Sequence, residues 1–335
     1  MGCVSAKSNC NSSQNCPCKR RKMYFNEIVS VKEIFNLSNY THFTLPLKCY
    51  IQPQCIKAML GEVKWLKQLK EFTLDASNKD IGNEGFEMIA KSLSYFSHIQ
   101  KLTLNLCFNF ITDKHMNKFS KNMIHLKNLT HLNIDFWSNT IQDQGLTHFS
   151  EGLQQLTDLE ELQLNLSNTS ITHIGSNKLG EALKHLTKLS SLKLCIAQNQ
   201  LKEEGIQQLS EAIKTLKSLK ILQIDLFDCN LQSIDQLTSS FKVTQNIQNI
   251  SLNLGQNKLQ NSDIRQLNEQ LCKINSLEQI FLKLKNIEID QADDIVMLRA
   301  FPNLKQKEIL TNTIDTDSDD DDCETKSSSP QSSEN

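Results

Sequence analysis

The segments "LTLNLCFNFI" (102–111), "LNIDFWSNTI" (132–141) and "LQLNLSNTSI" (162–171) repeat one pattern at intervals of 30 residues. The same pattern starts again, with a single interval of 28 residues, at Phe72, Leu192, Leu222, Ile250 and Ile280. A further apolar residue lies three positions before each start, so the unit reads LxxLxLxLxxNxL. Self-similarity at this period predicts an array of stacked units, each of which buries its apolar face against its neighbours.

Each unit changes its hydrophobic period half-way. The apolar residues of the first half alternate with polar ones, which predicts a strand with one face toward the core. In the second half apolar residues recur at spacings of three and four, as in Ile206, Leu209, Ile213 and Leu216, which predicts a helix. Every repeat is therefore expected to be a strand, a turn and a helix.

The unit resembles the leucine-rich repeat family, in its ribonuclease-inhibitor-like subclass, over residues 43–310, with one added "Lx" step relative to the family consensus. The resemblance implies a curved α/β solenoid, with a parallel sheet on the concave face and helices on the convex face. It also implies a ladder of Asn side chains in the turns, which matches Asn109, Asn139, Asn199 and Asn257. Thr169 and Cys229 replace this Asn in two units and are expected to weaken the ladder there.

The sequence divides into three parts. Residues 1–22 hold five basic side chains and no carboxylate, whereas residues 311–335 hold six Asp, two Glu and one Lys. Such charged ends are typical of solvated tails. Residues 23–310 form the predicted repeat domain, with an amino-terminal cap at 23–71 and repeats at 72–310. Within it, 24–37 could cap a degenerate first unit at 43–69, and 296–310 would close the far end.

Odd positions of each predicted strand should face the concave side. One column there is almost entirely Asp or Asn, including Asp75, Asp135 and Asp225, and a second column holds Trp137 and Phe227. Two interpretations are open. The Asp/Asn column is either a structural habit of the repeat, or part of a mildly acidic surface that binds a basic protein or peptide with the two aromatic residues as anchors. The acidic surface argues against nucleic acid as a partner.

The sequence shows no signature of catalysis or of a cofactor. Nucleotide-binding, zinc-protease, hydrolase and kinase motifs are missing, and the eight His residues are scattered. The pair Cys16 and Cys18 has no second pair to complete a zinc site. No stretch approaches a membrane span, and the eleven Cys without a secretory signal fit a reducing cytosol. The prediction is a non-enzyme without metal, cofactor or small-molecule substrate.

The first residues, "MGCVSAK", resemble the amino ends of Met-Gly-Cys proteins that carry myristate and palmitate, although Ala6 stands where the signal usually has Ser or Thr. The resemblance implies myristate on Gly2 and palmitate on Cys3. A single myristoyl chain binds membranes only marginally, so a second signal is needed. The basic run Lys19, Arg20, Arg21 and Lys22 would add attraction to an anionic leaflet. These residues predict a lipid-anchored protein on the cytoplasmic face of a membrane.

Two alternatives remain to a membrane-anchored scaffold. A repeat arc followed by an acidic tail also resembles the GTPase-activating protein of the nuclear-transport GTPase, but Arg265 and Arg299, the two Arg outside the amino-terminal tail, fall in or near predicted helices. The other alternative is a soluble repeat protein with an inert tail.

The acidic tail contains two predicted phosphorylation sites. Thr316 and Ser318 each precede an Asp by three positions, a pattern that acidophilic kinases accept.

Overall fold

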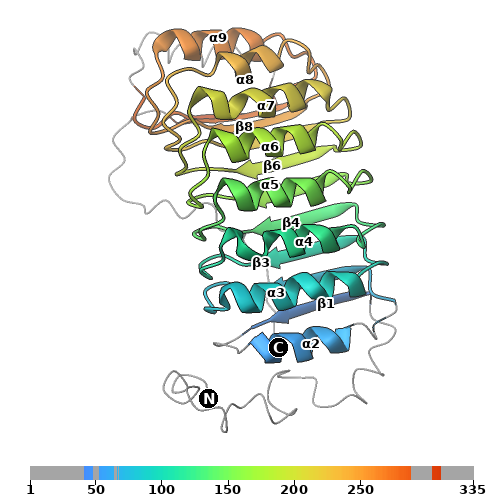
Figure 1. Cartoon of the computed structure of the whole chain (residues 1–335). Helices are drawn as coiled ribbons and strands as arrows, with labels where there is room; N and C mark the ends of the chain where they lie inside the picture. The colour runs from blue at the N-terminus through green and yellow to red at the C-terminus, as the bar shows by residue number, and fades with distance from the viewer. Residues whose placement is uncertain (1–40, 48–52, 64–65, 67, 288–303, 311–335) are drawn as a thin grey trace, which may run out of the picture.

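The computed structural model describes residues 41–47, 53–63, 66, 68–287 and 304–310, and a long parallel sheet runs through it (Figure 1). Within these residues the sheet has ten strands, each paired with the next in sequence. The strands are β1 (His42–Pro46), β2 (Glu71–Asp75), β3 (Lys101–Asn105), β4 (His131–Asp135), β5 (Glu161–Asn165), β6 (Ser191–Cys195), β7 (Ile221–Asp225), β8 (Asn249–Asn253), β9 (Gln279–Lys283) and β10 (Gln306–Leu310). The fold is a leucine-rich-repeat-type α/β solenoid, as predicted.

The strand register follows the sequence repeat. Leu102 on β3 lies opposite Leu132 on β4, and Leu132 lies opposite Leu162 on β5. At the 28-residue interval, Leu222 on β7 lies opposite Ile250 on β8. Equivalent residues of successive repeats therefore form straight columns across the sheet.

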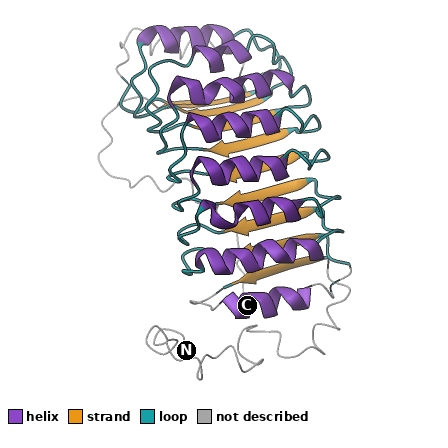
Figure 2. Cartoon of the chain, viewed as in Figure 1, coloured by secondary structure: helices purple, strands orange, loops and turns teal. Residues whose placement is uncertain are grey.

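The helices form a second layer on one face of the sheet (Figure 2). They are α2 (Pro53–Val63), α3 (Gly82–Ser92) with the short η3 (Leu93–Tyr95), η4 (Asp113–His115) with α4 (Met116–Met123), α5 (Gln142–Leu153), α6 (His173–Leu183), α7 (Lys202–Thr215), α8 (Asp235–Ser240) and α9 (Asn261–Leu271). The six-residue α8 belongs to the 28-residue repeat that begins at β7.

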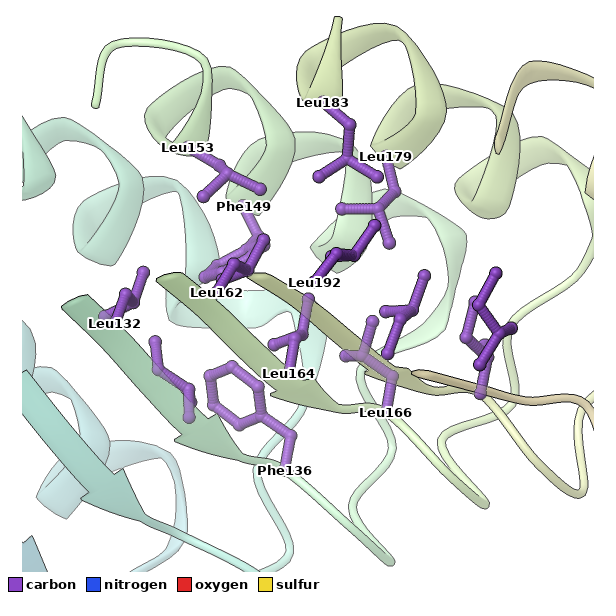
Figure 3. Packing of buried hydrophobic residues seen from close by; sticks show 14 of the residues in the cluster. Leu132, Phe136, Phe149, Leu153, Leu162, Leu164, Leu166, Leu179, Leu183 and Leu192 are labelled. Carbon is purple, nitrogen blue, oxygen red and sulfur yellow. The ribbon is translucent and has the colours of Figure 1, made fainter. Parts of the chain in front are cut away.

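The core is one continuous layer between the sheet and the helices. Leu132, Leu162 and Leu192 rise from the strands toward Phe149 and other apolar residues of α5 and α6 (Figure 3). Each of these residues is at most 1 % exposed. Burial of such a side chain stabilises the fold by about 2 kcal/mol, so the repeats hold one another through shared apolar surface.

Gly180 allows two neighbouring helices to approach closely. A Cβ at this residue of α6 would collide with the backbone carbonyl carbon of Gln208 on α7. A side chain at position 180 would therefore force these two helices apart.

A ladder of buried Asn side chains ties each turn to the turn before it. The amide nitrogen of Asn199 donates to the carbonyls of Leu166, Ile196 and Ala197 at 2.8, 3.0 and 3.1 Å. Its side-chain oxygen accepts the backbone N–H groups of Thr169 and Ile171 at 3.2 and 2.9 Å. Asn109, Asn139 and Asn257 make corresponding bonds, which confirms the predicted ladder.

The two exceptions make fewer bonds. The Thr169 hydroxyl donates within its own turn, to the carbonyl of Leu166 at 2.5 Å, whereas the Cys229 thiol donates to the carbonyl of Ile196 in the turn before it at 3.2 Å. A hydroxyl or a thiol has a single hydrogen, whereas the Asn amide has two donors and a separate acceptor.

Both ends of the described array extend the repeat. β1 and α2 form the degenerate first unit predicted at 43–69, and β10 adds a strand at the far end. Phe43, Leu304 and Ile309 pack against the core at these ends. The predicted cap at 24–37 and the two predicted tails lie outside the described residues.

We expect Asn199→Ala to lower the free energy of unfolding by about 3 kcal/mol, because it leaves several buried backbone groups without partners. Gln207→Ala, a change of an exposed amide on α7, is the control and should have little effect. Chemical denaturation measures both variants. A loss at position 199 no larger than that of the control would show that the ladder contributes little to stability.

Candidate protein-binding surface

The sheet face opposite the helices, here called the open face, presents alternate residues of each strand. In β2, for example, Phe72 and Leu74 are buried toward the helices, whereas Glu71, Thr73 and Asp75 are only half-buried. The fifth residue of each strand from β2 to β9 forms the Asp/Asn column: Asp75, Asn105, Asp135, Asn165, Cys195, Asp225, Asn253 and Lys283. Residues two positions further form the rim column: Ser77, Cys107, Trp137, Ser167, Ala197, Phe227, Gly255 and Lys285.

The Asp/Asn column shapes the ends of the strands. Asp135 accepts the backbone N–H of Trp137 at 2.8 Å, and Asp225 accepts that of Phe227 at 2.9 Å. The same bond from the rim column recurs at Asp75, Asn105, Asn165 and Asn253, so six of the eight residues make it. A short carboxylate or amide that bonds the N–H two residues on is a typical turn device. These bonds support the structural interpretation of the column.

Two of the aspartates also pair with an Asn on the next strand. The Asn253 amide donates to Asp225 at 3.1 Å, and the Asn165 side chain bonds Asp135. Burial raises the pKa of both carboxyls, and these hydrogen bonds offset part of the rise. Only 8 % of Asp135 is exposed, so little of its side chain is available for direct contact with another molecule.

The two predicted anchors, Trp137 and Phe227, are half-buried on the rim column. The Trp137 ring meets Phe108 edge to face, with ring centroids 4.6 Å apart. Phe227 lies over Gly255 on the other side, where a Cβ would stand 3.1 Å from Cδ2 of Phe227. Between the anchors the rim column holds only the small residues Ser167 and Ala197.

The acidic side chains are unevenly distributed on the open face. Asp75, Asp135 and Asp225 lie on β2, β4 and β7, whereas Lys283 and Lys285 lie at the carboxyl-terminal end of the array. From β2 to β7 the open face carries five carboxylates, Glu71, Asp75, Asp135, Glu161 and Asp225, and two basic side chains, Lys101 and Lys193. This stretch, which includes Trp137 and Phe227, is therefore acidic on balance. This refines the mildly acidic surface expected along the whole arc.

Phe108 and Phe110 lie in the turn after β3, outside the alternating strand positions from which the surface was predicted, so the sequence pattern did not identify them. They are 41 % and 73 % exposed, and Phe108 completes an aromatic pair with Trp137. A comparison of turn positions across repeats could have found them, since the equivalent residues of the other repeats are polar or charged.

Two cysteines in this region, Cys107 on the rim column and the buried ladder residue Cys229, are poor nucleophiles. Burial raises the pKa of the Cys107 thiol to about 12, and Asp135 and Asp75 add to the rise. Burial raises the pKa of Cys229 to about 12 as well. Both thiols stay protonated near neutral pH, whereas nucleophilic attack requires the thiolate. Among the described residues, no group of three His, Cys, Asp or Glu side chains is arranged to hold a metal ion.

Several predicted sites lie outside the described residues. They are the acylation sites Gly2 and Cys3, the basic run Lys19, Arg20, Arg21 and Lys22, and the phosphorylation sites Thr316 and Ser318. Arg265, relevant to the GTPase-regulator alternative, lies on α9 in the helix layer, and Arg299 is not described. Across the described part of the chain, every helix is too short or too polar to span a bilayer.

Comparison with known proteins finds similarity only to solved structures. No protein-family model and no curated protein matches the sequence. One match is a chain in a crystal structure of the Rad7 and Elc1 complex in yeast, with 15 % sequence identity and a TM-score of 0.47. The match covers 86 % of the present chain and 75 % of the matched chain. A protein from Bacteroides fragilis is 14 % identical, with 81 % and 76 % coverage and a TM-score of 0.47. Similarity at this level carries no conclusion about function.

Asp135 and Asp225 should titrate above the usual aspartate value of about 3.9, because their native environment disfavours the charged form. The native state then binds these protons at a higher pH than the unfolded state does. Their contribution to stability should therefore improve as pH falls through the native pKa and diminish as pH rises through it. Carboxyl carbon NMR titration measures the midpoints, and values at or below the usual one would contradict the burial argument.

Proposed function

We propose that this repeat solenoid is a scaffold that binds a protein or peptide of basic character on its open face. The observation that carries the proposal is the pair Trp137 and Phe227. They are the two large aromatic residues on a rim column that otherwise holds Ser, Cys, Ala, Gly and Lys. Half-buried aromatic residues with flat, rigid rings are typical anchors of protein interfaces.

The spacing of the anchors suits an extended peptide. They lie three strands apart, which corresponds to about 14 Å across the sheet. One ring turns toward Phe108 and the other lies over Gly255, while the small side chains of Ser167 and Ala197 occupy the sheet between them. An extended chain that crosses the strands can therefore contact both rings with side chains about four residues apart on the same side of the chain.

The charge of this region favours a basic partner. On this stretch of sheet the carboxylates Glu71, Asp75, Asp135, Glu161 and Asp225 outnumber the basic side chains Lys101 and Lys193, and the net negative charge would repel a nucleic-acid backbone. Complementary charge speeds association and selects among partners more than it adds affinity. The aromatic anchors would then supply most of the binding energy.

Trp137→Ala combined with Phe227→Ala should weaken partner binding by about thirtyfold or more, since truncation of one hot-spot residue costs about 2 kcal/mol. The measurement is quantitative affinity purification, followed by direct titration of the purified partner. Tyr95→Ala, which removes an exposed aromatic residue beyond α3, is the matched control. Partners that bind the double variant as tightly as the original protein would contradict the proposal.

A second part of the proposal is that the amino end holds this scaffold on the cytoplasmic face of a membrane. Myristate on Gly2 and palmitate on Cys3 would supply two acyl chains, each adding about 0.8 kcal/mol per buried CH₂. The run from Lys19 to Lys22 would add about 1 kcal/mol per basic residue at an anionic leaflet. The support is the sequence "MGCVSAK" with the basic run behind it.

Gly2→Ala should turn a membrane-pelleting protein into a soluble one in eukaryotic cells, because it removes the amine that receives myristate. Cys3→Ser should release only part of the protein, because one acyl chain and the basic run remain. Fractionation after labelling with a myristate analogue measures both effects, with Ser13→Ala as the control. Unchanged pelleting of the Gly2 variant would rule out the lipid anchor.

A further inference from the structure

The turn after each strand provides an internal comparison among repeats. The third residue after each strand from β2 to β9 has a left-handed backbone, with φ between 51° and 61°. These residues are Asn78, Phe108, Ser138, Asn168, Gln198, Asp228, Gln256 and Asn286. Four repeats have a second left-handed residue two positions later: Asp80, Phe110, Ser170 and Asn230. Seven repeats thus have a polar or charged residue at the first left-handed position. The repeat of β3 has Phe at the first and also at the second position.

The fold does not require Phe at either position. The left-handed conformation suits Asn and Asp, whose short polar side chains bond locally, and it strains a bulky side chain. Phe108 and Phe110 also expose 41 % and 73 % of their surface to water. Strained residues with exposed apolar surface are typical of ligand-binding sites rather than of structural turns.

Phe108 and Trp137 form an aromatic corner at the edge of the open face. The two rings meet at 67°, and the Phe108 N–H donates to the Trp137 carbonyl at 3.0 Å, which fixes one turn against the next. Phe110 follows two residues later. We call Phe108, Phe110 and Trp137 the aromatic corner.

Negative charge lies at the base of the aromatic corner. Asp75 on β2 and Asp135 on β4 lie opposite Asn105 of the intervening β3, two residues before Cys107. Both carboxylates act on the Cys107 thiol, and the opposing influence of Lys79 is weaker than either. A cation above an aromatic face is attracted by the ring, most strongly by Trp, and nearby carboxylates add to this attraction.

We propose that the aromatic corner is the specific recognition site of the open face, and that it binds an extended segment of a partner protein with an Arg or Lys beside a large apolar side chain. The basic group would lie over Trp137, near Asp75 and Asp135, and the apolar side chain would contact Phe108 and Phe110. This inference rests on the proposed function and adds the site and the chemistry that it selects.

The test is selection of a random peptide library displayed on phage against the full chain. We expect enriched peptides to contain Arg or Lys next to a large apolar residue. The variant Phe108→Asn with Phe110→Ser gives this turn the residues that the repeat of β5 carries at Asn168 and Ser170. It should weaken binding of the selected peptides by about tenfold. Its melting temperature should be unchanged or higher, because strain is relieved.

The matched control is Asn168→Ser with Ser170→Asn, which alters the same positions two repeats away and should leave binding unchanged. Peptides that lose binding in the Trp137 and Phe227 double variant but keep it in the Phe108 and Phe110 variant would overturn the aromatic corner and leave the proposed function intact. Peptides that bind both variants normally would overturn both proposals.

Selection of purely apolar or acidic peptides would also overturn the inference. The same holds if no peptide is selected and light scattering shows a dimer that the Phe108 and Phe110 variant turns into a monomer. In that case the aromatic corner binds a second copy of the chain.

Discussion

The buried amide of the ladder Asn is the interaction on which the rest of the structure depends. Asn199 makes five buried hydrogen bonds, of which three reach the preceding repeat, at Leu166, Thr169 and Ile171, and two stay within its own turn. Because the first three connect residues about one repeat apart, they fix the register of neighbouring strands. Equivalent residues then align as columns across the sheet. The Asp/Asn column and the rim column exist as surfaces only because of this alignment.

The repeat made the fold predictable from the sequence. Strand, helix and core positions depend on local periodicity, and the family pattern marked Asn109, Asn139, Asn199 and Asn257. The open face was predictable only in part. Alternation placed Trp137 and Asp135 on it, but the burial of Asp135 depends on Asn165 of the next strand and on its own bond to the Trp137 N–H. Such burial is a property of neighbouring columns, and spacing along one strand does not reveal it.

On the open face, hydrogen bonds compensate the carboxylates that the repeat buries. A carboxylate withdrawn from water is costly unless hydrogen bonds compensate it. At β4 and β7 the aspartate is followed on the next strand by an Asn that donates to it, and a backbone N–H supplies a second bond. Each of Asp135 and Asp225 therefore lies at a position where two hydrogen-bond donors already point to its carboxylate. Their charges are held in fixed geometry beside Trp137 and Phe227.

A repeat protein can tolerate a departure in one unit because each unit contacts mainly its neighbours. Strain in the turn that carries Phe108 and Phe110 is confined between the ladder bonds of Asn109 and Asn139, which hold the turns on either side. A binding site can therefore be formed within one repeat while the fold that all repeats share is preserved. The regular pattern then explains why the chain folds, and the proposed recognition site lies where one repeat departs from that pattern without structural need. The proposal ranks Phe108 and Phe110 above the aspartates, because the aspartates bond the turns in most repeats, whereas the other repeats have polar or charged residues at the positions of the two phenylalanines.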